Sequence, residues 1–124
     1  MNRFLLFILS VSLLTACNST LTPAKDTGVE GQVLLGPMCP VVRLDQPCPD
    51  RPYQSTLIVL NLAGNKIAQI QTDVIGVYRL ALLPGDYIMH PESPNMMPYA
   101  QDQPFSVLAG QFTKLDIVYD SGIR

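Results

Sequence analysis

The sequence predicts an all-β protein, a seven-stranded antiparallel β-sandwich. Short segments in which apolar and polar residues alternate recur along the chain after residue 27, and a period of two is typical of strands with one buried face. Turn residues, chiefly Gly, Pro, Asn and Asp, separate these segments. No segment after residue 17 has the period of an amphipathic helix. Many short strands with frequent turns are characteristic of a sandwich.

Residues 1–16 have the order of a lipoprotein signal peptide and are excluded from the fold. Arg3 supplies a positive charge, and residues 4–14 are an apolar run shorter than the roughly 20 residues that span a bilayer. Leu14-Thr15-Ala16-Cys17 resembles a bacterial lipobox, in which small residues fit the peptidase and the Cys17 thiol carries the lipid. An ordinary secretory signal with an incidental cysteine is the alternative. Several acyl chains, palmitate among them, anchor stably where one chain is marginal.

Residues 17–27 are polar and lack periodicity, which predicts a flexible tether between the lipid and the domain. Asn18, rather than Asp, follows Cys17. In a Gram-negative envelope this favours the outer over the inner membrane. We therefore expect a lipid-anchored protein at the cell membrane or the outer membrane, facing the periplasm or the exterior. The type of envelope stays open.

The predicted mature chain is weakly acidic. The whole sequence has 8 Lys and Arg against 10 Asp and Glu, and cleavage before Cys17 removes Arg3, which brings the net charge to about −3. The basic residues are scattered, which argues against a nucleic-acid partner. The expected partners are the membrane, through the lipid on Cys17, and another envelope protein. No cofactor is expected.

Two further cysteines, Cys39 and Cys48, are predicted to form a disulfide, because an exported chain meets oxidising conditions. A metal or redox pair is the alternative, but the spacing and the absence of a nearby histidine fit neither. On the chain-entropy model, so short a loop stabilises the fold by about 2.5 kcal/mol.

The domain is predicted to span residues 28–120 and to end in a short tail, 121–124. Its first strand covers 28–35. The residues of this strand that share the inward parity are Val29, Gly31, Val33 and Leu35.

Residues 36–52 are rich in proline, which removes ladder donors and excludes a central strand. Together with the disulfide, the prolines predict a stiff flap. We expect its apolar residues, Val41, Val42 and Leu44, to pack onto a sheet edge.

Residues 55–62 are apolar on both parities, as expected for a central strand covered on both faces. The pattern leaves open which parity faces the core. Residues 66–72 predict a short strand with imperfect alternation.

Residues 72–87 predict a turn, a strand, a second turn and the start of another strand. Asp73 caps the first turn, and Gly76 tolerates its positive φ. Pro84-Gly85 forms the second turn. The inward-facing residues in and just after this segment are Tyr78, Leu80, Leu82, Tyr87 and Met89.

Residues 90–104 are proline-rich and irregular. Two strands follow, 105–109 and 112–120. Their predicted inward residues are Phe105, Val107 and Ala109 in the first and Thr113, Leu115, Ile117 and Tyr119 in the second, with Lys114 and Asp116 outside.

The pattern Thr72-Asp73-x-x-Gly76-x-Tyr78, followed by Pro84-Gly85-x-Tyr87, resembles that of carboxypeptidase regulatory-like domains. The resemblance covers roughly residues 28–119 and implies an immunoglobulin-like sandwich of the transthyretin-like or collagen-adhesin-B-like kind. It implies no particular function, because one fold serves many.

Two relatives of this fold carry chemistry. Collagen-adhesin-B-like domains form a Lys–Asn isopeptide, but here the first strand has Glu30 and the last has Asp116, which leaves only a Lys66–Asp116 substitute. Transthyretin-related hydrolases need several histidines, whereas His90 is alone in this chain. We expect no enzymatic activity.

His90 lacks a visible nucleophile partner. With Met89, Met96 and Met97 it is the alternative candidate for a copper(I) or small-ligand site, since thioethers and imidazole suit that ion; gap-filling methionines are the commoner use. The loop acids Asp45, Asp50 and Asp102 lack the spacing of a calcium loop.

These observations favour a non-enzymatic, lipid-anchored envelope protein with an accessory or adhesive role. Binding residues concentrate on loops that a rigid scaffold holds. We therefore expect the binding surface at the proline-rich end, formed by the flap and the 91–104 loop. The alternative function is a carrier of copper or another small ligand.

Overall fold

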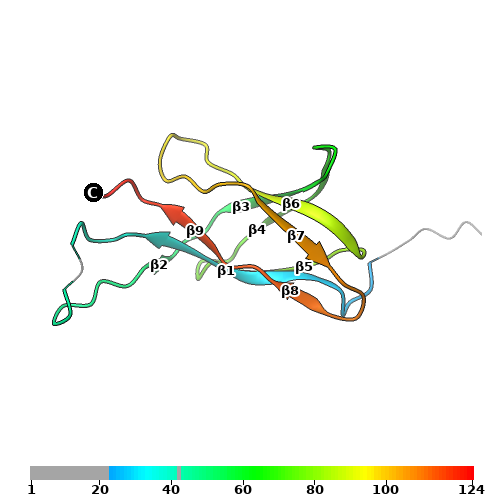
Figure 1. Cartoon of the computed structure of the whole chain (residues 1–124), viewed down its shortest axis with the longest axis horizontal. Helices are drawn as coiled ribbons and strands as arrows, with labels where there is room; N and C mark the ends of the chain where they lie inside the picture. Colours follow the sequence, from blue (N-terminus) through cyan, green and yellow to red (C-terminus); the bar gives the residue numbers. More distant parts are fainter. Residues whose placement is uncertain (1–22, 42) are drawn as a thin grey trace, which may run out of the picture.

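The computed structural model describes residues 23–41 and 43–124 as an all-β fold, with no helix in that part of the chain (Figure 1). Two sheets, of five and four strands, share one core. The predicted all-β class is confirmed, and the arrangement is consistent with a β-sandwich. The predicted signal peptide and Cys17 lie outside the described residues. Within them, the fold offers no helix of the length and apolarity needed to cross a membrane.

Strand β1 (Gly28–Gly36) is the centre of the five-stranded sheet. One edge of β1 pairs antiparallel with β5 (Val77–Ala81) and then with β2 (Arg51–Pro52). The other edge pairs with β8 (Phe112–Lys114) and then with β9 (Ile117–Asp120), both parallel to β1. Because β1 has partners on both edges, it lies in the interior of its sheet.

The four-stranded sheet is antiparallel, in the order β4-β3-β6-β7. Its strands are β3 (Thr56–Asn61), β4 (Lys66–Gln71), β6 (Gly85–Pro91) and β7 (Gln103–Val107). The proline inside β7, Pro104, is tolerated because β7 is an edge strand and one row of its backbone groups needs no partner.

The pairing of β1 with β8 and β9 corrects the prediction of a purely antiparallel fold. Turn spacing predicts the direction of strands that follow one another, whereas these strands come from opposite ends of the domain. A parallel pair needs a long crossover connection, and the whole chain between β1 and β8 supplies it. The five-stranded sheet is therefore mixed.

The predicted last strand is also interrupted, between β8 and β9. At the break, the Leu115 carbonyl accepts a hydrogen bond from the Tyr78 hydroxyl. The same Leu115 carbonyl lies against Gly31. A Cβ added at Gly31 would be 2.0 Å from the Leu115 carbonyl oxygen. The Asp116 carboxylate then accepts the backbone N–H of Gln32 at 2.9 Å and replaces a ladder bond. Burial, and secondarily the Asp116 charge, raises the pKa of Tyr78, which keeps its phenol protonated as a donor.

Alternating residues from both sheets fill the core, as the sequence predicts. Leu57 and Val59 of β3 are fully buried. The odd-numbered residues of the segment 55–62 therefore face the core, which the sequence left open. Ala109, predicted to face inward, is exposed because it lies in the turn after β7. The buried hydrophobic residues are Val29, Val33, Leu57, Val59, Tyr78, Leu82, Tyr87, Met89, Ala100, Phe105, Val107, Ile117 and Tyr119.

The segment 72–87 carries the chain from the four-stranded sheet to the five-stranded sheet and back, because β4 and β6 belong to one sheet and β5 to the other. Asp73 caps the first turn, as predicted, and accepts the backbone N–H groups of Ile75 and Val77 at 3.1 and 2.8 Å. Gly76 has φ 77°. Gly85, predicted to lie in the second turn, is already the first residue of β6.

Candidate functional site

Three proline-bordered or terminal segments meet at one end of the sandwich, which we call the flap end. They are the flap 36–52, the loop 92–102 and the tail 121–124, and Figure 1 shows them toward the side where the C-terminus is marked. The tail follows β9, whose last residue, Asp120, exchanges two backbone hydrogen bonds with Tyr99 of the loop, at 3.1 and 2.7 Å. The next residue, Ser121, donates its backbone N–H to Gly36 of the flap at 3.0 Å. The C-terminal segment therefore ties the flap to the loop.

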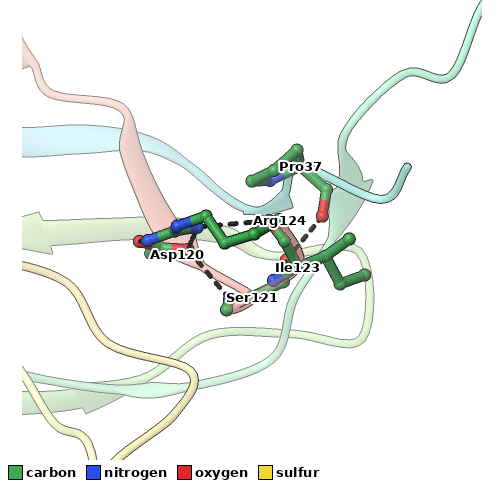
Figure 2. A network of polar contacts seen from close by, with 6 residues as sticks. Pro37, Asp120, Ser121, Ile123 and Arg124 are labelled. Atoms are coloured by element: carbon green, nitrogen blue, oxygen red, sulfur yellow. Dashed lines mark hydrogen bonds and ion pairs between the residues drawn. The ribbon is translucent and has the colours of Figure 1, made fainter. Parts of the chain in front are cut away.

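A polar network holds this tail in place (Figure 2). The Arg124 guanidinium makes two bonds to the Asp120 carboxylate, Nη1 to Oδ1 at 3.1 Å and Nη2 to Oδ2 at 2.8 Å. The backbone N–H of Gly122 donates to the same Oδ1 at 2.8 Å. The Ser121 hydroxyl donates to the Pro37 carbonyl and accepts the N–H of Ile123. These bonds give an exposed tail a defined conformation.

The charge of Asp120 is stabilised by this arrangement. The Arg124 side chain, and secondarily the Gly122 N–H, lower the pKa of the Asp120 carboxyl to about 2. The carboxylate is therefore ionised at any pH where the domain is expected to work. Because its partners belong to its own tail, we read its role as structural.

The predicted disulfide between Cys39 and Cys48 is present and closes the base of the flap. Above it, Gln46 N–H donates to the Arg43 carbonyl at 3.2 Å and forms a tight turn. The tip of this turn carries Leu44, whose side chain is fully exposed. The flap is thus a closed loop with an apolar residue at its tip.

The structure corrects the prediction that the apolar residues of the flap pack onto a sheet edge. Val41 is 70% exposed, and Leu44 is 109% exposed; Val42 lies outside the described residues. The flap reaches a sheet only through its last two residues, Arg51 and Pro52, which form β2; the disulfide and the prolines constrain the part that carries Val41 and Leu44 without a sheet contact. Met96, Met97 and Tyr99 of the opposing loop are exposed as well, at 92%, 48% and 48%.

The flap end also contains a hollow of about 180 Å³ between the start of β3 and the 92–102 loop. Tyr53, Gln71 and Glu92 are among the residues that line it. Polar walls beside exposed apolar loops are typical of a protein-binding surface.

His90 pairs with Asp102, a partner that the sequence did not indicate, with Nδ1 2.6 Å from Oδ1. Both side chains are about half exposed. Met89 cannot share a ligand with His90, because adjacent strand residues point to opposite faces and Met89 is fully buried in the core. Met96 and Met97 lie in the exposed loop. In the described residues, no hydroxyl or thiol is hydrogen-bonded to His90.

The remaining predicted acids and the isopeptide substitute are dispersed. The Asp50 carboxylate lies against the backbone of Gly36, and Asp45 is exposed in the flap. Among the described residues, no three His, Cys, Asp or Glu side chains are grouped to hold a metal ion. Lys66 belongs to β4 and donates to Gln69, whereas Asp116 lies at the break between β8 and β9 and accepts the Gln32 N–H of the other sheet. The structure does not bring Lys66 and Asp116 together.

A second hollow, of about 450 Å³, lies on the outer face of the five-stranded sheet. It is lined by charges of both signs, among them Glu30, Arg79, Lys114 and Asp116. Arg79 is engaged twice, with Glu30 at 3.6 Å and over the ring of Phe112 at 3.8 Å. The outward parity of these residues was readable from the sequence. Their proximity was not, because it depends on the pairing of β1 with both β5 and β8.

Comparison with known protein families and with curated proteins finds no match to this chain.

Proposed function

We propose that the chain is a lipid-anchored, non-enzymatic protein of the cell envelope, and that its sandwich presents a protein-binding surface at the flap end. The observation that carries this proposal is the exposure of apolar side chains on two constrained loops at one end of the domain. Leu44 at the flap tip is fully exposed, and Met96 is 92% exposed. Exposed apolar residues on a rigid frame are typical of interaction sites.

The rigidity of the surface supports this reading. The disulfide closes the flap, and the C-terminal segment bonds to both loops. Loops that are already ordered lose less conformational entropy on binding than flexible ones. The resemblance of residues 72–87 to carboxypeptidase regulatory-like domains supports a scaffold role for the rest of the fold, because the residues of that pattern lie in turns, in the core or, for Gly85, at the start of β6.

The anchor part of the proposal is tested first. Mass spectrometry of the mature N-terminal peptide should show acyl chains on Cys17. A Cys17→Ser variant should leave the membrane fraction. Retention of this variant in membranes, without acylation of the wild type, would contradict the lipid anchor.

Site-specific photocrosslinking in the native host tests the binding surface. A benzophenone amino acid at position 44 or 96 of the full chain should give the same crosslinked partner, which is then identified by mass spectrometry and confirmed by crosslinking from its own side. Ile67, 48% exposed on β4, is the matched control position. An equal yield of the same adduct from position 67 would contradict the assignment of the binding surface to the flap end.

A further inference from the structure

Four segments meet at the end of the sandwich opposite the flap end, and we call this the anchor end. They are the chain entry 23–27 and the turns 62–65, 82–84 and 108–111. Figure 1 shows the entry and the three turns on the side away from the C-terminus.

Hydrogen bonds and strand register establish this grouping. The Thr27 hydroxyl accepts the N–H of Gly110 at 2.9 Å, and the Thr27 carbonyl accepts the N–H of Leu82 at 3.1 Å. In the other sheet, Asn61 at the end of β3 is paired with Tyr87 near the start of β6. The turn after β3 therefore lies beside the turn before β6.

The turns of the anchor end carry exposed apolar side chains. Leu62 is 66% exposed and Leu108 is 58% exposed, each as the first residue after its strand. Ala63 and Ala109, which follow them, and Pro84 in the turn before β6 are exposed too. Among the described strands, Leu62 lies beyond the last paired residue of β3, and Pro84 and Leu108 lie beyond the last pair between β6 and β7.

Charge is distributed unevenly between the two ends. Within the segments of the anchor end, Lys25 is balanced by Asp26. In the described segments of the flap end, together with Asp120 directly before the tail, acids outnumber bases. The acids there are Asp45, Asp50, Glu92, Asp102 and Asp120, and the bases are Arg43, Arg51 and Arg124. Where a lipid surface is anionic, it repels the flap end and leaves the anchor end unopposed.

The position of the tether decides which surface the anchor end meets. The chain from Cys17 to Pro23 reaches at most roughly 20 Å when fully extended. If Cys17 carries the lipid, Pro23 at the chain entry stays within that distance of the bilayer surface, and the anchor end is the end of the domain nearest to the tether.

We propose that the anchor end docks on the bilayer surface, with Leu62 and Leu108 inserted among the lipid headgroups. This inference rests on the lipid anchor of the proposed function. The tether supplies proximity, and the two leucines supply the apolar contact that orients the domain. The flap end then points away from the membrane, where a partner can reach it.

The absence of tryptophan from the chain allows a direct test. The mature acylated protein, residues 17–124, is reconstituted into vesicles with a single substitution, Leu62→Trp, Leu108→Trp or, as the control, Leu44→Trp. Brominated acyl chains should quench the fluorescence at positions 62 and 108 about twofold or more, because interfacial side chains lie at the boundary between headgroups and acyl chains. Position 44 should show no quenching.

Vesicle flotation in the same samples separates the two proposals. If the proteins float but the tryptophans at positions 62 and 108 are quenched no more than the one at position 44, the lipid anchor stands and the docking proposal is wrong. Acylated proteins that fail to float would overturn both. Because all three positions are exposed, the substitutions should not disturb the fold, which far-ultraviolet circular dichroism checks.

Discussion

A single methyl group at Gly76 should destabilise the domain strongly. Gly76 has φ 77°, and a Cβ there would lie 2.2 Å from the Val33 carbonyl oxygen. That oxygen accepts the N–H of Tyr53 at 3.0 Å. Gly76→Ala therefore combines a left-handed conformation with a steric collision that pushes a bonded carbonyl out of place.

The expected cost follows from these three effects. Left-handed backbone costs about 1–2 kcal/mol, offset in part by about 0.4–1 kcal/mol from the stiffer unfolded chain. Overpacking adds about 1–3 kcal/mol, and the strained bond between Val33 and Tyr53 adds about 1 kcal/mol. The three costs less the offset give about 2–6 kcal/mol for Gly76→Ala.

Gly64 is the matched control, because its φ is 87° but nothing lies within 4 Å of a Cβ added there. Gly64→Ala should cost only about 1 kcal/mol. Thermal and urea unfolding of the oxidised soluble chain, residues 18–124, measures both variants. The melting temperature should fall by more than about 10 °C for Gly76→Ala and by about 4–8 °C for Gly64→Ala. Equal losses in the two variants would refute the steric argument.

Three further predictions concern the tyrosine at the strand break, the C-terminal tail and the flap. Tyr78→Phe should cost about 1 kcal/mol in urea unfolding, because it leaves a carbonyl without its donor; a neutral result would mean that water replaces the phenol. Since the folded-state pKa of Asp120 is depressed to about 2, the order of the tail should persist above the ordinary carboxyl pKa and disappear as pH falls through about 2. An NMR titration should show this, and Arg124→Ala should raise that pKa; an unchanged value would contradict the ion pair. Replacing Cys39 and Cys48 by Ser should cost about 2–3 kcal/mol and open the flap to proteolysis, and a flap that still resists protease would show that the prolines alone hold it.

Alternation predicted the core well where a strand has one buried face. Tyr78, Met89 and Ile117 are buried as their parity indicates. The prediction for Val41 and Leu44 did not use alternation and was wrong, because it assumed that apolar residues must be covered. In a flap held by a disulfide and prolines, the covalent constraint replaces the hydrophobic contact, and the side chains stay in solvent.

Features that depend on the pairing of residues far apart in the chain could not be predicted from the sequence. The charged hollow around Glu30 and Arg79 requires the register of β1 with both of its neighbours. The His90–Asp102 pair requires the return path of the 92–102 loop. Neither relation leaves a local signal in the sequence. The flap end is different, since prolines and cysteines mark its segments directly, and only their joining by the tail needed the structure.

The pairing of β1 with β9 means that the domain cannot finish folding until nearly its whole length is available. Gln32 and Asp116 are 84 residues apart, yet they bond to each other at the centre of the five-stranded sheet. Contacts of such high sequence separation slow folding, because a large loop must close before they form. A chain still emerging from a ribosome or a translocation channel would therefore remain unstructured in this sheet. For a protein that we propose is exported, that delay keeps the chain unfolded enough to pass through a translocation channel until its last strand has been synthesised.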